Sequence, residues 1–225
     1  MILKNLFLCL IVTFVITGSG MIVHSGYFYA KGLLAQFLLN QTWERSKSTK
    51  QFIKAWSWAD TYPVGKLRIN AIDLSRVVLK DAKNESLAFG PAHISVSAQP
   101  GSNGNIAIAG HRDSFFRNLR RVKGGEIIEL ESMGSVQYFI VTDIEISEPE
   151  DTTWVDNSAG NVITLITCYP FDYIGPAPKR YIVRGKFVKE RSHDNLAGLG
   201  DSGLLTKARN SDPLPAPKNI ANLNV

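Results

Sequence analysis

Beyond Pro63 the chain consists of short segments rich in β-branched and aromatic residues, separated by Gly, Pro, Asn and Asp. Such segments are typical of strands, and the separating residues are typical of turns. Many short strands joined by turns predict an all-β barrel or sandwich. A short helical turn is expected at Ser86 to Phe89. The expected strands are Val64–Ile69, Val77–Leu79, Asn105–Ala109, Glu126–Glu131, Val136–Ile146, Val162–Thr167 and Arg180–Val188.

An apolar stretch from Leu6 to Val23 follows Lys4 near the start of the chain. Its 18 positions would span about 27 Å as a helix, close to the hydrocarbon thickness of a bilayer. A cleaved signal peptide, with Gly18 and Gly20 at the cleavage site, and an uncleaved anchor are both open. The anchor is favoured because apolar residues continue beyond that site. Lys4 indicates a cytoplasmic N-terminus, which places the rest of the chain outside.

The composition changes along the chain and predicts four regions. Helical spacing of Leu33, Leu34, Phe37 and Leu38 indicates an amphipathic helix after the apolar stretch. The last region is rich in Asn, Asp, Gly, Ser and Pro and has little periodicity, which predicts a disordered tail. The regions are an anchor or signal segment at 1–25, an amphipathic helix with a connector at 26–60, the β-barrel at 61–190, and the tail at 191–225.

The charge and the distribution of acidic residues argue against several kinds of ligand. The net charge is +5, and no dense run of Lys and Arg with interleaved aromatic residues occurs, so we do not expect nucleic-acid binding. Calcium would need carboxylates on the barrel loops, and the loop from Ser97 to Asn103 has none. We expect no metal and no cofactor. The acidic residues that do cluster are interpreted as a solvated face; they are Glu145, Glu148, Glu150 and Asp151.

Two very apolar predicted strands end in residues that can carry chemistry. The strand ending at Ala109 is followed by Gly110 and His111, and the strand ending at Thr167 is followed by Cys168. If the two strands are parallel neighbours, His111 and Cys168 emerge at the same end of the sheet, as nucleophilic catalysis by a thiolate requires. Taken singly, His111 is more simply a loop histidine and Cys168 a buried structural cysteine. Cys168 is expected to be a free thiol.

A third strand brings a cation to the same place. If the strand that begins near Arg180 forms a hairpin with the Cys168 strand, Arg180 lies beside the cysteine. Arg184 falls on the same face by alternation. It would sit roughly 13 Å further along the strand, so Arg180 is the better candidate to hold an oxygen that becomes negative during acyl transfer. The alternative for either arginine is a surface salt bridge, and for Arg184 we prefer that alternative.

These residues also match a known pattern. The segment from Thr164 to Cys168 reads TLITC, and with the downstream Arg180 it resembles the sortase signature TLxTC followed by arginine. The segment from Gly104 to Arg112 resembles the strand and loop that carry the histidine of that family. The resemblance covers roughly Trp56 to Val188. It is strongest to the sortases of Gram-negative bacteria, through Leu87–Pro91, Gln99–Gly101, Cys168–Asp172 and Trp58–Pro63.

The resemblance implies an eight-stranded β-barrel with short helices and a thiol transpeptidase activity. It makes Cys168 the nucleophile, His111 the acid and base, and Arg180 the stabiliser of the oxyanion or substrate. Thr167 would contact substrate or position the cysteine, although a buried strand threonine is equally compatible with the pattern. The implied partners are a secreted protein with a C-terminal LPXTG-like sorting signal and an amine acceptor of the cell envelope. The expected location is the inner (cytoplasmic) membrane, with one span and the barrel on the extracytoplasmic side.

The order and setting of these residues also bear on two other classes of protein. L,D-transpeptidases and papain-like peptidases are disfavoured, because here Cys168 follows a threonine at a strand end and His111 precedes it in the chain. A membrane-tethered barrel that only binds a peptide is a non-enzymatic alternative. It would tolerate the loss of Cys168, so thiol alkylation distinguishes it from the enzyme.

Overall fold

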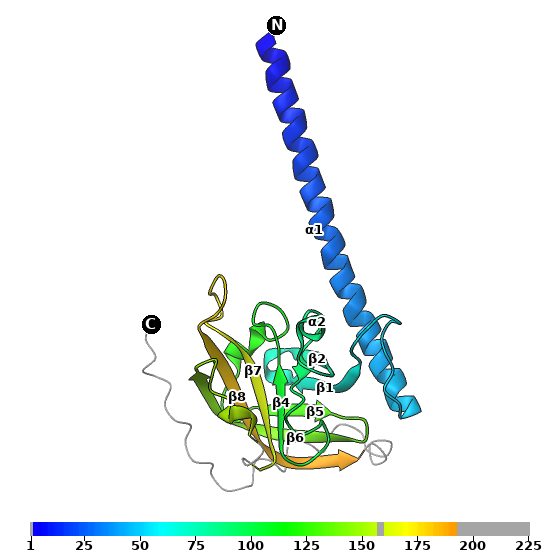
Figure 1. Cartoon of the computed structure of the whole chain (residues 1–225), viewed down its shortest axis with the longest axis vertical. Helices are drawn as coiled ribbons and strands as arrows, with labels where there is room; N and C mark the ends of the chain where they lie inside the picture. The colour runs from blue at the N-terminus through cyan, green and yellow to red at the C-terminus, as the bar shows by residue number, and fades with distance from the viewer. Residues whose placement is uncertain (1, 157–159, 193–225) are drawn as a thin grey trace.

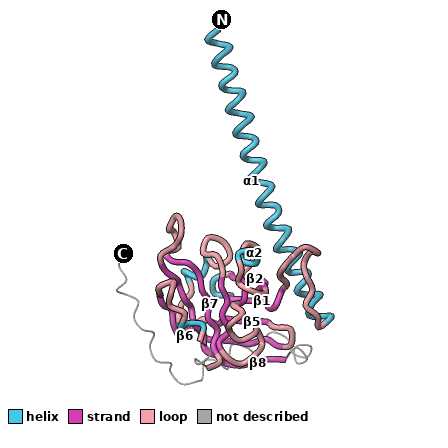
Figure 2. Tube along the Cα trace, viewed as in Figure 1, coloured by secondary structure: helices cyan, strands magenta, loops and turns pink. Residues whose placement is uncertain are grey.

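The computed structural model describes residues 2–156 and 160–192, which form a long helix and a β-barrel (Figure 1). Turns and short helices link the strands, and the tube view shows the strands gathered in one body beside the C-terminal end of the long helix (Figure 2). The elements are α1 (Ile2–Thr49), β1 (Pro63–Ile69), η1 (Asn70–Ile72), β2 (Leu74–Leu79), α2 (Asn84–Leu87), β3 (Ala92–His93), β4 (Asn105–Ala109), η2 (Arg117–Arg121), β5 (Ile127–Glu131), β6 (Ser135–Ser147), η3 (Thr153–Val155), β7 (Val162–Tyr169) and β8 (Lys179–Ser192).

The strands close into a mixed barrel in the order β1-β2-β3-β4-β7-β8-β6-β5. This confirms the predicted eight-stranded barrel. Most neighbours are antiparallel, but β2 and β3 are parallel, and so are β4 and β7, with Asn105 opposite Val162 and Ala109 opposite Ile166. The strand absent from the sequence prediction is β3, whose two residues connect β2 to β4.

Alternation along the strands separates an interior core from an outer wall. Ile106 and Ile108 of β4 and Ile163 and Leu165 of β7 are at most 1% exposed and belong to the interior core. The residues between them point to the outside of the barrel, because successive side chains of a strand lie on opposite faces. Continuing this alternation along β7 places Cys168 on the outer wall, and Thr167 points inwards.

The helix α1 is continuous from Ile2 to Thr49. The sequence suggested an anchor and a separate amphipathic helix, but the segment contains no proline that would end the helix between them. Its N-terminal part extends away from the barrel, and its C-terminal part packs against it (Figure 1). Over its described residues it is long and apolar enough to cross a membrane, which is consistent with a membrane anchor.

A second apolar cluster attaches α1 to the barrel. Leu39 and Trp43 of the helix are 2% and 0% exposed and pack on Val77, Leu79 and Ala92 of β2 and β3. Burying two large side chains of this kind contributes several kcal/mol, roughly 2 to 3 for each. The position of the helix on the barrel is therefore set by packing. The predicted tail from 191 lies outside the described residues, apart from residues 191 and 192, which end β8.

A buried carboxylate reinforces this attachment. Glu131, at the end of β5, is 5% exposed. It accepts hydrogen bonds from Lys47 Nζ at 2.7 Å and Trp43 Nε1 at 3.4 Å on α1, and from Arg68 Nη2 at 3.0 Å on β1. Burial alone would raise the pKa of Glu131, but these partners lower it below its ordinary value of 4.5. Glu131 thus joins the helix to two strands of the barrel.

We expect Glu131→Gln to lower the free energy of unfolding by about 2 to 3 kcal/mol, because Lys47 and Arg68 lose a buried counterion. The pKa of Glu131 is lower in the folded chain than in the unfolded chain, so its contribution is present above pH 4.5 and is lost as the pH falls. Urea unfolding in detergent between pH 7 and 3 should therefore show a flatter acid limb in the variant. Glu129→Gln is the matched control, because Glu129 lies on the same strand and among the described residues forms its one ion pair with Arg68. Equal losses in both variants would contradict the role of Glu131.

Candidate active site

The carboxyl ends of β4 and β7 bring His111 and Cys168 to one end of the barrel. Gly110 N–H donates to the carbonyl of Ile166 at 3.0 Å, which continues the parallel pairing one residue beyond β4. His111 and Cys168 each stand two residues beyond the last registered pair, Ala109 and Ile166. His111 is exposed and Cys168 is a half-buried free cysteine. The parallel arrangement expected from the sequence is confirmed.

The residues that precede the pair fix the local backbone. A Cβ on Gly110 would lie 2.7 Å from the ring of Phe116, so only glycine fits between the strand end and that buried ring. Thr167 is 3% exposed and its Oγ1 donates to the carbonyl of Gly110 at 2.7 Å. This hydroxyl links the residue before Cys168 to the residue before His111. A contact between Thr167 and substrate stays a prediction.

Arg180 lies directly opposite Cys168 in the antiparallel pair of β7 and β8. Residues that face each other across two strands project on the same side of the sheet, so both belong to the outer wall. Arg180 Nη1 donates to the carbonyls of Lys179 at 3.1 Å and Ala177 at 3.4 Å. Among the described residues no carboxylate is within ion-pair distance of Arg180, which leaves its charge available to a substrate.

Arg184 occupies a different environment on the same strand. It is paired with Thr164 in the register, four residues from Arg180, and its Nη2 reaches the carbonyl of Thr153 at 3.5 Å. Within the part of the chain that the structure describes, it forms no salt bridge, contrary to the preferred expectation. Its distance along β8 from Cys168 separates it from the site, as the sequence predicted.

An aromatic cluster borders the cysteine. Tyr181 stacks on Tyr169 with 6.2 Å between ring centroids and meets Phe171 edge-on at 5.0 Å. Burial, followed by the nearby Tyr169, raises the pKa of Tyr181 to about 12. Tyr181 therefore stays a neutral phenol at physiological pH. Tyr181 and Phe171 pack against the interior core, on the face of the strands opposite to Cys168 and Arg180.

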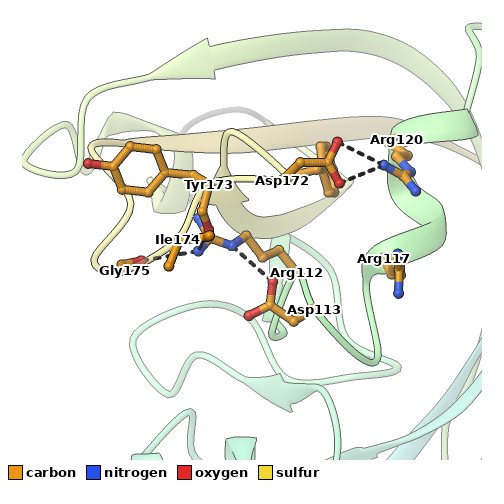
Figure 3. Close-up of a pocket in the computed structure, with 9 residues that line it drawn as sticks. Arg112, Asp113, Arg117, Arg120, Asp172, Tyr173, Ile174 and Gly175 are labelled. Carbon is orange, nitrogen blue, oxygen red and sulfur yellow. Dashed lines mark hydrogen bonds and ion pairs between the residues drawn. The ribbon is translucent and has the colours of Figure 1, made fainter.

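Arg112 is the residue of this region that sequence reasoning did not single out. Its side chain is 7% exposed and lies under the loop between β7 and β8 (Figure 3). Nη1 donates to the carbonyl of Pro170 at 3.0 Å, and Nη2 donates to those of Tyr173 at 2.5 Å and Gly175 at 3.1 Å. One guanidinium thus joins the residue after His111 to the segment that follows Cys168. No sequence pattern signals this, because its partners are backbone carbonyls about 60 residues away.

A pocket of about 450 Å³ lies beside the three predicted site residues and does not include them. Its walls come from the loop after β4 with η2, and from the loop between β7 and β8 (Figure 3). Arg120 of η2 faces Asp172 across it, with Nη1 3.2 Å from both carboxylate oxygens. The lining residues are Arg112, Asp113, Arg117, Arg120, Phe171, Asp172, Tyr173, Ile174 and Gly175.

We expect Arg112→Lys to lower kcat/KM for peptide ligation by about 10- to 100-fold, because an ammonium cannot hold three carbonyls in the geometry of the guanidinium fork, and small displacements of reacting groups are costly. The loss should appear mainly in kcat, with the far-UV spectrum of the fold retained. Arg117→Lys, exposed in the same pocket, should stay within about threefold of the parent. A change confined to KM would instead make Arg112 a substrate-binding residue.

The acidic cluster is spread over β6 and the loop after it. Asp151 accepts hydrogen bonds from Thr153 Oγ1 at 2.6 Å and Ser147 Oγ at 2.7 Å, which lower its pKa to about 2. Glu148 pairs with Lys179 at 3.2 Å. Two of the four carboxylates thus have partners within the protein.

Comparison with known proteins links this geometry to one family. The family model described as "Sortase domain" matches residues 67–188. Sortase D of Bacillus subtilis is 36% identical over 126 residues, and Sortase A of Bacillus anthracis is 30% identical over 129 residues. These matches take in 55% and 56% of this chain and 63% and 60% of the relatives, so the chain spans less than two thirds of either relative.

A similar fold occurs in a solved structure. The structure of a Sortase D5 transpeptidase of Clostridium perfringens superposes with a TM-score of 0.56 over 69% of this chain and 99% of that one. Its sequence is 22% identical, so this likeness concerns the fold. The Gram-negative type suggested by the sequence motifs stays a prediction.

Proposed function

The chain belongs to the sortase family, and from this premise we propose that it is a cysteine transpeptidase that cleaves an LPXTG-like sorting signal. One observation carries the proposal. Cys168 faces Arg180 across β7 and β8, and His111 follows the strand that runs parallel to β7. A thiol, an imidazole and a guanidinium therefore come from three neighbouring strands at one end of the barrel, which supports the roles of nucleophile, proton carrier and oxyanion stabiliser.

In the first half of the reaction, the thiolate of Cys168 attacks the carbonyl carbon of the Thr–Gly bond. The oxyanion that forms is held by the guanidinium of Arg180. His111, as imidazolium, gives its proton to the departing glycine nitrogen, the C–N bond breaks, and a thioester remains on Cys168. Thr167 acts through the backbone in this scheme: its bond to the Gly110 carbonyl keeps the ends of β4 and β7 in register.

In the second half, an amine of the acceptor attacks the thioester carbon. His111 takes the proton of that amine, the C–S bond breaks, and Cys168 leaves as thiolate while a new amide forms. Protons and electron pairs balance without a metal or cofactor. The proposed partners are a secreted protein with a C-terminal sorting signal and an amine acceptor of the cell envelope.

The proposed location follows from α1 and from the sequence motifs. Lys4 ahead of the apolar stretch supports a single span with the barrel outside the cytoplasm. The motifs that resemble Gram-negative sortases, Leu87–Pro91 and Cys168–Asp172, support the inner (cytoplasmic) membrane and a periplasmic barrel. Cell fractionation with protease accessibility of the barrel in spheroplasts tests this placement.

The activity is tested with the full chain in detergent, a panel of LPXTG-like peptides and a small amine such as triglycine. Intact-mass spectrometry should detect a thioacyl adduct, and product analysis should detect amine-dependent ligation. Treatment with a thiol alkylating agent should abolish both. A folded protein that binds a peptide equally well after alkylation, and never forms an adduct across the panel, would establish the non-enzymatic peptide-binding barrel instead.

A further inference from the structure

We propose that the tip of the β7–β8 loop, residues 173–175, rests on the surface of the membrane in which α1 is anchored. The inference depends on the anchoring role proposed above for α1. In the proposed contact, Tyr173 and Ile174 enter the interfacial layer of the membrane. Arg117 and Arg120 of η2 face the anionic lipid headgroups. The end of the barrel that carries Cys168 would then be held next to the bilayer.

The orientation of the barrel is set by α1. The helix runs without interruption from its apolar part to the part that packs on the barrel. Figure 1 shows the loop between β7 and β8 rising from the barrel on the side toward which the N-terminal part of α1 extends. Because α1 is continuous and packs on the barrel at one end, it fixes the orientation of the barrel relative to the bilayer. This loop then faces the bilayer.

The distance between barrel and bilayer is short. No Asp, Glu, Lys or Arg occurs between Lys4 and Lys31, and these 26 positions span about 39 Å of helix, which fills a hydrocarbon core and reaches the interface. Lys31 Nζ lies 5.1 Å from the ring centroid of Tyr27, and aromatic and basic residues are typical of the interfacial layer. The first bond from α1 to the barrel, Gln36 Nε2 to the carbonyl of Phe89, follows five residues later, or about 8 Å along the helix.

The loop tip has the chemistry of an interfacial contact. Ile174 is 97% exposed and Tyr173 is 46% exposed, and the guanidinium of Arg112 lies 5.9 Å from the ring centroid of Tyr173. The backbone beneath them is held by Arg112, which binds the carbonyls of Tyr173 and Gly175. The tip is therefore a braced apolar projection, which can insert between lipid headgroups at low entropic cost.

Cations flank this tip on the same end of the barrel. Arg117 and Arg120 line the same pocket as Ile174, from the η2 side (Figure 3). Arg117 is exposed, and among the residues that the structure describes Arg120 forms an ion pair with Asp172 alone, which is itself exposed to solvent. Each arginine near an anionic surface strengthens binding by about fivefold. An apolar tip flanked by cations fits a bilayer surface that contains anionic lipid.

The contact is tested on the full chain in nanodiscs of three parts phosphatidylcholine and one part phosphatidylglycerol. In a Cys9→Ser, Cys168→Ala background, an environment-sensitive fluorophore is attached at Ile174→Cys. The matched control is Val188→Cys, which is 50% exposed near the opposite end of β8. We expect a blue-shifted emission and quenching by headgroup spin-labelled lipid at position 174, and neither at position 188. Arg117→Gln with Arg120→Gln should reduce the quenching by about half.

The outcomes separate this inference from the proposed anchor and activity. A chain that does not copurify with nanodiscs refutes the anchor and the membrane contact together. An inserted chain whose label at 174 is as accessible to aqueous iodide as that at 188 refutes the contact alone. Emission at 174 that responds to an added sorting peptide but not to lipid quencher would assign the tip to the substrate and would also overturn the proposal. Peptide ligation by the unlabelled parent in detergent reports on the activity independently.

Discussion

Replacement of Cys168 by alanine is expected to abolish the thioacyl adduct and to lower amine-dependent ligation by at least about 10⁴-fold, since the loss of a covalent nucleophile removes both half-reactions at once. The parent is the Cys9→Ser variant, in which Cys168 is the only thiol. Ligation of a fluorescent sorting peptide to triglycine measures turnover, and intact-mass spectrometry measures the adduct.

Cys168→Ser is a second variant that removes the thiol but keeps a side chain of similar size. Serine keeps the size and a hydrogen-bonding group at the half-buried position, so the fold and peptide binding should persist. An alcohol beside an imidazole without the remaining machinery of a serine hydrolase is a poor nucleophile, and ligation should stay close to the alanine level. If either variant retained more than about a tenth of the parental rate, Cys168 would not be the nucleophile.

The sequence predicted most of the barrel because its strands carry strong local signals. The parallel pair β4 and β7 is apolar on both faces, and this pattern indicated strands buried in the sheet before any pairing was known. The short strand β3, Ala92–His93, has no such signal, because two residues cannot display a period. The continuity of α1 was also missed, since the change from apolar to amphipathic composition near residue 25 suggested a boundary that the backbone does not have.

The residues of the candidate site also divide into those that the sequence could predict and one that it could not. The relation between His111 and Cys168 was predictable, because both follow strands whose ends meet if the strands are parallel. The pairing of Cys168 with Arg180 was predictable from a hairpin. Arg112 was not, because it acts on the carbonyls of a loop distant in sequence, and any polar residue can follow a histidine in a loop. Contacts between side chains and remote backbone have no periodicity from which they could be predicted.

The choice between the two arginines of β8 gives the second large effect. We expect Arg180→Ala to lower kcat by about 10²- to 10³-fold with little change in KM, as the loss of a group that binds a developing oxyanion does. Arg184→Ala should remain within about threefold of the parent. The reason is geometric: Arg180 is opposite Cys168, whereas Arg184 is opposite Thr164, roughly 13 Å further along the strand.

Arg180→Lys separates charge from geometry. A lysine keeps the positive charge but loses the planar fork. The kcat of Arg180→Lys should therefore exceed that of Arg180→Ala by about tenfold and stay below that of the parent. The bonds of Arg180 Nη1 to the carbonyls of Lys179 and Ala177 leave its other N–H groups for the substrate oxygen. Should Arg180→Ala instead raise KM at constant kcat, the arginine would bind the sorting signal equally in ground and transition states. Equal losses in the Arg180 and Arg184 variants would trace the effect to the fold of β8.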